Sequence, residues 1–171
     1  IETSAKKISY AASCYYVDQL EYEDICKILR NFDAISVRES SLARFIKKKC
    51  KSEKDIITVM DPVFLLNAND YLSLIPNRIK KGKYCFAYFV NENSEMKDYI
   101  DNLRENGIEV VELHYFKDTV KSDDSKIYNL GPIEFLNYLF YSDSIITDSF
   151  HGTALSIILK KSFWTFGDSM S

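Results

Sequence analysis

The sequence lacks the charge pattern of a nucleic-acid-binding protein. Its 171 residues carry a formal net charge of −3, and no predicted face combines lysines and arginines with interleaved aromatic side chains. The one basic cluster closes a predicted helix, where cations interact favourably with the helix dipole; it consists of Lys47, Lys48, Lys49 and Lys51. We therefore expect no nucleic-acid partner and interpret this cluster as a solvated helix end rather than a phosphate or membrane patch.

The sequence also lacks a membrane-spanning segment and a metal-ligand cluster. Its longest unbroken apolar run, residues 85–90, is far shorter than the roughly 20 residues that a spanning helix needs. Histidine, cysteine and acidic residues nowhere recur at metal-ligand spacing. We predict no transmembrane segment and no metal, and leave peripheral membrane association open.

The four cysteines show neither zinc-binding nor redox spacing. Cys14, Cys26, Cys50 and Cys85 lie far apart, with no CxxC pair and no partner histidine at ligand distance in the sequence. We expect all four to be reduced, buried thiols. This expectation favours a cytoplasmic location.

What is present is an alternation of β-branched runs and amphipathic runs, which is typical of a parallel sheet covered on both faces. In the first part of the chain, Ser40 and Ser41 can cap the second predicted helix. The stretch 67–82, with its asparagines, proline and glycine, is the best candidate for a linker. The strands are predicted at 6–13, 33–37 and 55–60, and the helices at 20–32 and 42–49.

The alternation restarts after the linker. Gly107 is placed to end one helix as a left-handed cap, and Pro132 to open another after a polar loop. The strands are predicted at 84–90, 108–113, 144–148 and 163–166, and the helices around 96–103, at 133–142 and at 154–161. Two such runs predict an α/β protein with two Rossmann-like units.

Ligands of open parallel sheets bind outside the carboxyl ends of the strands, so the residues that follow each strand are the site candidates. Arg38 follows one strand, and its planar fork either clamps a carboxylate or phosphate or pairs with Glu39 or Asp33. Asp61 follows another, where Pro62 favours a turn-forming role. The sequence does not decide between the two roles of Arg38.

The third candidate is the segment "DSFHGT", residues 148–153, between a predicted strand and a predicted helix. A helix start offers unpaired N–H groups and partial positive charge to an anion. His151 adds a proton donor or acceptor there, and Gly152 lets the backbone approach a ligand. Alternatively, the same residues are structural, with Asp148 or Ser149 capping the helix.

Four segments in this order resemble the polysaccharide pyruvyl transferase family: "KKISYAAS", "FDAISVRESS", "VMDPVFLL" and, most specifically, "SIITDSFHGTALSIILKKSF". The resemblance covers nearly the whole chain. It implies transfer of the enolpyruvyl group of phosphoenolpyruvate to sugar hydroxyls, which forms a pyruvate ketal in bacterial exopolysaccharide or capsule biosynthesis. Phosphoenolpyruvate is then the donor substrate, a saccharide or lipid-linked oligosaccharide is the acceptor, and no cofactor is required.

The implied fold is similar to that of GT-B glycosyltransferases, with two Rossmann-like domains. Such a chain is usually about twice this long, and this one starts without methionine, so we expect a fragment whose first unit is incomplete and which need not be active by itself. The expected division is 1–66 for the closing part of the first domain, 67–82 for the linker and 83–171 for the second domain, truncated near its end.

The resemblance also implies site residues. The "FHG" pattern supports His151 as the catalytic acid–base group, and "VRE" supports Arg38 as an anion-binding group. Ser149, Gly152 and Thr153 are expected to bind substrate at the helix start. Many relatives carry arginine where this chain has Ser149, so one cation of the expected anion site is missing.

The sequence leaves two other functions open. The same geometry can hold the diphosphate of a nucleotide sugar, as in a GT-B glycosyltransferase, and the Ser149 departure is consistent with a non-catalytic member of a polysaccharide assembly locus. Among the aromatic side chains only Tyr10, Tyr15 and Tyr16 are candidates for a ligand cleft. Helix aromatics such as Phe45, Tyr99, Phe135 and Phe140 are expected in the core.

Overall fold

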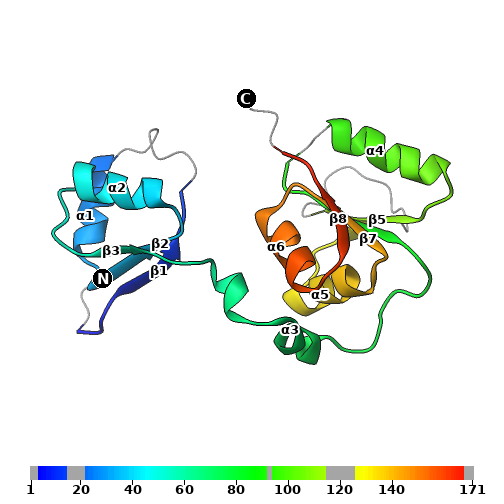
Figure 1. The fold of residues 1–171 in the computed structure, drawn as a ribbon, viewed down its shortest axis with the longest axis horizontal. Coiled ribbons are helices and arrows are strands. Elements are labelled where there is room, and N and C mark those ends of the chain that lie inside the picture. The colour runs from blue at the N-terminus through cyan, green and yellow to red at the C-terminus, as the bar shows by residue number, and fades with distance from the viewer. Residues whose placement is uncertain (1–3, 15–21, 92–93, 115–125, 168–171) are drawn as a thin grey trace. The chain divides into compact units, whose positions relative to one another are not determined.

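The computed structural model describes residues 4–14, 22–91, 94–114 and 126–167, and the chain divides into two compact units, 1–65 and 66–171. Each unit is an all-parallel sheet with helices packed on it, which confirms the predicted α/β class (Figure 1). The first unit contains β1 (Ile8–Ala12), α1 (Tyr22–Arg30), β2 (Ala34–Val37), α2 (Ser40–Lys49), β3 (Ile56–Thr58) and the short 3₁₀ turn Pro62–Leu65. The second contains α3 (Ala68–Leu74), β4 (Cys85–Tyr88), α4 (Ser94–Glu105), β5 (Val110–His114), β6 (Lys126–Tyr128), α5 (Pro132–Tyr141), β7 (Ser144–Thr147), α6 (Phe150–Ile158) and β8 (Ser162–Thr165).

The first unit winds in one direction only. Its strand order is β1-β2-β3, and right-handed crossovers between strands added on the same side place both helices on one face. Accordingly, α1 and α2 both pack on the face that buries Ile35 and Val37 (Figure 1). On the other face Ile8 and Ile57 are 63% and 59% exposed. The expectation of helices on both faces is therefore wrong for the described part of this unit.

A disulfide joins the two helices of the first unit. Cys26 of α1 and Cys50, which ends α2, are bonded and buried in the core cluster. The expectation of four free thiols is wrong for this pair, because two helices on one face bring cysteines 24 positions apart in the sequence to a Cα–Cα distance of 4.9 Å. Cys14 and Cys85 are free, and Cys85 is buried as expected; burial raises the pKa of its thiol.

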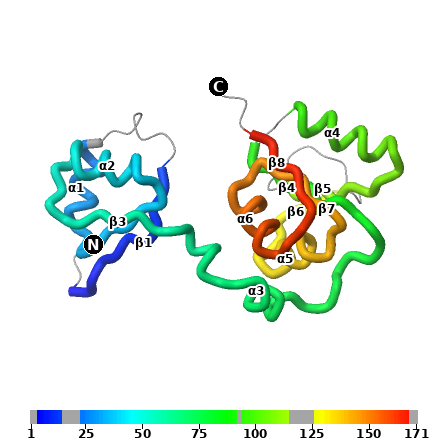
Figure 2. Tube along the Cα trace, in the orientation of Figure 1, coloured from blue at the N-terminus to red at the C-terminus, as the bar shows by residue number. Residues whose placement is uncertain are grey.

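The second unit reverses direction. Its order is β6-β5-β4-β7-β8, so the chain builds outward from β4 on one side and then continues from β7 on the other. The helices fall on both faces: α4 covers one, while α5 and α6 cover the other (Figures 1 and 2). Cys85, Ala87 and Val110 pack under Met96 and Ile100 of α4. This unit confirms the expected cover on both faces.

The aromatic side chains of the helices behave mostly as core residues. Phe135 of α5 contacts the buried Phe86 at a ring-centroid distance of 5.7 Å. Phe45 and Tyr99 pack against the core clusters of the first and second units respectively. The predicted core role is confirmed for these three helix residues.

Several local features differ from the sequence-based expectations. The 67–82 stretch contains α3, whose start is fixed by a capping box between Asn67 and Asp70. The expected polar loop before Gly131 contains β6, which pairs with β5. In α2 the N-cap is Glu39, without a side-chain cap, and both predicted cap serines are helical. The left-handed Gly107 and the proline opening α5 are as predicted.

Candidate functional site

The second unit has a point at which its strand order reverses, between β4 and β7. These neighbouring strands end in register, Tyr88 opposite Thr147. In open α/β sheets a crevice forms outside the carboxyl ends of such strands, because the chain leaves them toward opposite sides. The segment with His151 follows β7 directly, so it lies at this point.

A chain of short polar contacts fixes the path from β7 into α6. The Thr147 hydroxyl accepts a hydrogen bond from the Ser149 N–H at 3.0 Å. The Ser149 hydroxyl accepts one from the Gly152 N–H at 3.3 Å, as the N-cap of α6. Ser149, rather than Asp148, is thus the cap, and the helix begins at Phe150, four positions before the predicted start. The Ser149 hydroxyl thereby satisfies one of the unpaired N–H groups at the helix start.

Gly152 is required by packing. A Cβ built on it would lie 2.5 Å from Thr147 Oγ1 and 3.1 Å from Thr147 Cβ, and both residues are buried. The missing side chain lets the first turn of α6 sit directly on the end of β7. The sequence indicated close approach at this glycine, and the structure shows that the neighbour is a strand side chain of the same unit.

His151 lies in the first turn of α6 with an exposed side chain. Its ring meets the Phe150 ring edge-on at a centroid distance of 5.2 Å, and Phe150 is itself 54% exposed. The imidazole is therefore presented to solvent near the positive end of the helix dipole. Thr153, also in the first turn of α6, places its hydroxyl 3.2 Å from that of Thr165 at the end of β8.

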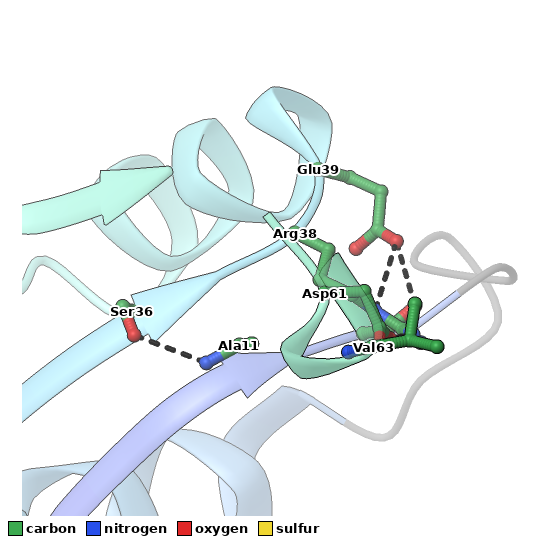
Figure 3. A network of polar contacts seen from close by, with 7 residues as sticks. Ala11, Ser36, Arg38, Glu39, Asp61 and Val63 are labelled. Carbon is green, nitrogen blue, oxygen red and sulfur yellow. Dashed lines mark hydrogen bonds and ion pairs between the residues drawn. The ribbon is translucent and has the colours of Figure 1, made fainter. Parts of the chain in front are cut away.

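The carboxyl edge of the first sheet carries a different group, built on charge (Figure 3). The Arg38 guanidinium, just after β2, forms an ion pair with Asp61, which is buried. Asp61 also accepts a hydrogen bond from the Val63 N–H at 2.9 Å. Arg38 thus pairs chiefly with Asp61, and not with Asp33 as the sequence also allowed; the Asp33 carboxylate accepts the Lys7 N–H instead.

Glu39 completes this charged group. Its carboxylate accepts the Ser13 hydroxyl at 2.6 Å and lies 3.9 Å from the Arg38 guanidinium. One guanidinium and two carboxylates carry a formal charge of 1 − 2 = −1. The Arg38 group is therefore held in place by acidic partners, which partly offset its attraction for an anion.

The structure thus places the predicted site residues in two groups. Ser149, His151, Gly152 and Thr153 lie together on the first turn of α6 and its cap. Arg38 lies in the first unit. Their convergence on one substrate stays a prediction. Of the cleft tyrosines, Tyr10 is 49% exposed, and Tyr15 and Tyr16 lie outside the described residues.

Sequence reasoning missed a second polar group in the second unit. Glu112 of β5 is buried. Its carboxylate accepts a hydrogen bond from the Arg104 guanidinium of α4 at 2.5 Å. The other carboxylate oxygen lies 3.1 Å from His114 Nε2. The signal was available, since His114 directly follows the strand predicted to end at residue 113. Lys161, after α6, plays a structural part: its ammonium donates to the Phe140 carbonyl at 2.7 Å, and burial lowers its pKa.

In the part of the chain that the structure describes, no group of three or more histidine, cysteine, aspartate or glutamate side chains is arranged to hold a metal ion. Within the same residues, no helix has both the length and the apolar character that crossing a bilayer requires.

Comparison with known proteins gives a family. No curated protein and no solved structure matches the chain. The family model described as polysaccharide pyruvyl transferase matches residues 1–169, which include both the Arg38 group and the first turn of α6. The chain therefore belongs to the polysaccharide pyruvyl transferase family.

Proposed function

We propose that the protein transfers the enolpyruvyl group of phosphoenolpyruvate to two hydroxyls of a sugar, forming a pyruvate ketal in surface polysaccharide biosynthesis. The observation that carries the proposal is the exposed His151 on the first turn of α6, at the reversal point of a parallel sheet, in a chain of this family. The acceptor is proposed to be a saccharide or a lipid-linked oligosaccharide.

The reaction requires balanced proton transfers. The methylene carbon of phosphoenolpyruvate gains one proton and becomes a methyl group. The neighbouring carbon forms bonds to two sugar oxygens, and its bond to the phosphate oxygen breaks. Of the two hydroxyl protons released, one balances the proton on the methyl carbon and the other leaves with inorganic phosphate. Such steps suit a side chain that gives and accepts protons near neutral pH, and histidine is the residue type best fitted to this task.

The donor is anionic at both its phosphate and its carboxylate, so its site needs oriented donors. The first turn of α6 contributes the positive end of a helix dipole beside His151 and Thr153. Arg38 is proposed to bind one of the two anionic groups; its ion pair with Asp61 fixes the direction of the guanidinium fork. Since Gly152 already donates its N–H to Ser149, these two residues act mainly by shaping the turn.

We further propose a cytoplasmic reaction, because phosphoenolpyruvate is a cytoplasmic metabolite. This location creates a tension with the Cys26–Cys50 bond, since cytoplasmic thiols are kept reduced. A thiol count on protein extracted under acid quench decides which form exists in the cell.

The experiment that tests the function measures phosphate release from phosphoenolpyruvate by the full-length protein, with and without sugar acceptors. Acceptor-dependent release that is lost in His151→Ala supports the proposal. Thermal-shift titrations with phosphoenolpyruvate and with nucleotide sugars run in parallel. Stabilisation by nucleotide sugars alone would identify a glycosyltransferase and reject the proposal, and so would the absence of release with every acceptor.

A further inference from the structure

Two aspartates bracket β7 and bind the backbone at opposite ends of the neighbouring strand. Asp143, just before β7, accepts the N–H of Tyr84, just before β4, at 3.0 Å. Asp148, just after β7, accepts the N–H of Val90 at 2.7 Å and that of Asn91 at 2.9 Å, one on each carboxylate oxygen. Both carboxylates accept backbone N–H groups, one at Asp143 and two at Asp148, but of the two residues Asp148 is the one at the carboxyl end of the sheet.

The Asp148 contact joins the two loops that border the reversal point. Val90 and Asn91 belong to the loop from β4 to α4, and Asp148 belongs to the turn from β7 to α6. The hydroxyls of Thr147 and Ser149 make contacts within the turn, while the Thr147 carbonyl and the Thr153 hydroxyl contact Phe166 and Thr165 at the end of β8. Asp148 ties the turn carrying His151 to the loop after the other neighbouring strand, β4.

The hydrogen bonds of Asp148 to the loop after β4 also affect where an anionic substrate group can bind. In a Rossmann unit with this strand order, the loop between the first strand and its helix receives the diphosphate of a nucleotide. Here two N–H groups of the equivalent loop bind a carboxylate of the protein itself. An anionic substrate group would have to displace Asp148 to bind there, which favours the neighbouring α6 turn as the anion site.

We propose that Asp148 is a positioning residue for the proposed transfer reaction: its two backbone hydrogen bonds hold the β7–α6 turn so that His151 faces the substrate in one orientation. The inference rests on the proposed function for its kinetic part only. A displacement of about 1 Å at a reacting group lowers the rate by up to about 100-fold, so a contact that holds a turn by two short hydrogen bonds is expected to act on kcat.

Asp143 supplies the matched control. Asp143→Asn and Asp148→Asn remove the same charge from the two ends of one strand, and each replaces an oxygen acceptor by an amide. Both are expected to lower the melting temperature. Only Asp148→Asn is expected to lower kcat, by about 10- to 100-fold, with the KM for phosphoenolpyruvate changed by less than about twofold.

A second measurement does not depend on activity. The sequence has two histidines, His114 and His151, and the variants His114→Ala and His151→Ala identify their signals in an NMR spectrum of the imidazole groups of the full-length protein. Asp148→Asn is expected to shift or broaden the His151 signals and to leave those of His114 in place, while Asp143→Asn is expected to leave both. Asp148→Glu, which keeps the carboxylate, is expected to restore part of kcat and replaces the asparagine variant if that one does not fold.

These outcomes separate the two proposals. If the wild-type protein releases no phosphate, the proposed function fails, and the imidazole spectra still test Asp148. If both asparagine variants lower kcat equally, or if Asp148→Asn leaves the His151 signals unchanged, Asp148 only stabilises the strand pair and the inference is overturned.

Discussion

The two sheets of this protein are built from the same strand–helix alternation, but they differ in the direction of winding and in the side chains at the carboxyl ends of their strands. The first adds strands in one direction, so its helices lie on one face, and a salt-bridged group of formal charge −1 stands at its carboxyl edge. The second reverses at β4–β7, carries helices on both faces, and presents an exposed imidazole on a turn fixed by hydroxyl and backbone contacts. Among the strands that the structure describes, the reversal point at which α/β sheets form ligand crevices lies in the second sheet.

This difference teaches that position after a strand is not enough to define a site. Arg38 and His151 both follow strands, yet the guanidinium pairs with a buried carboxylate while the imidazole is exposed. The carboxyl edge of the first sheet therefore depends on electrostatics, and that of the second on close packing. Substitutions in the two units are therefore expected to affect activity and stability to different extents.

The largest expected effect is on catalysis in the second unit. His151→Ala is expected to lower phosphate release about 1,000-fold, close to 4 kcal/mol in activation free energy, because it removes the proposed acid–base group. Its free energy of unfolding should change by less than about 0.5 kcal/mol, since the side chain is exposed. Ile157→Ala, at an exposed position later on α6, is the control. Equal activities of the two variants would remove His151 from the mechanism.

The next effect is on the stability of the first unit. Reducing the Cys26–Cys50 bond is expected to lower the free energy of unfolding by about 3 kcal/mol, since it releases a loop of 24 positions in the unfolded chain. Denaturant unfolding with and without reductant measures this change. The double variant Cys26→Ala/Cys50→Ala should not respond to reductant. Four reactive thiols in the unfolded, non-reduced protein, instead of two, would show that the bond is absent.

A smaller loss is expected at the ion pair of the first unit. Asp61→Asn leaves the Arg38 charge without its buried partner and is expected to cost about 2 kcal/mol, less than a fully buried pair because the Arg38 side chain is 26% exposed. It should also raise the KM for phosphoenolpyruvate, because the guanidinium loses its orientation. Asp24→Asn, in an exposed pair with Lys27, should change the free energy of unfolding by less than about 0.5 kcal/mol. If urea unfolding shows that Asp61→Asn and Asp24→Asn lower the free energy of unfolding equally, the expected difference between the buried and the exposed ion pair is wrong.

The smallest effect tests close packing in the second unit. Alanine at an open helix position stabilises by up to about 1 kcal/mol relative to glycine, but Gly152→Ala is expected to destabilise by about 1 kcal/mol, because its Cβ would meet Thr147 Oγ1. A double-mutant cycle with Thr147→Ala measures the coupling. If Gly152→Ala stabilises the protein, the packing account of this glycine is wrong.

Much of the fold could be predicted because each local signal is complete within a short segment. The proline that opens α5 and the left-handed Gly107 act on their own backbone, and the apolar stripes of α1 and α4 follow from helical spacing. Strand β6 could not be predicted, because three residues are too short to show a periodicity and they gain strand structure by pairing with β5. The sequence allows Ser149 as the cap of α6, but Gly152 in the first turn is a poor helix former, so the start at Phe150 was not predicted.

The sequence by itself determined the class of the protein, the order of its strands and helices apart from α3 and β6, and the candidate residues Arg38 and His151, because periodicity and motif spacing are properties of neighbouring residues. Tertiary structure alone decided that Arg38 pairs with Asp61, that two cysteines meet, and that Asp148 binds the loop after β4. These contacts join residues 23 to 58 positions apart, and such separations carry no local signal: only the direction in which each sheet is wound brings the partners together.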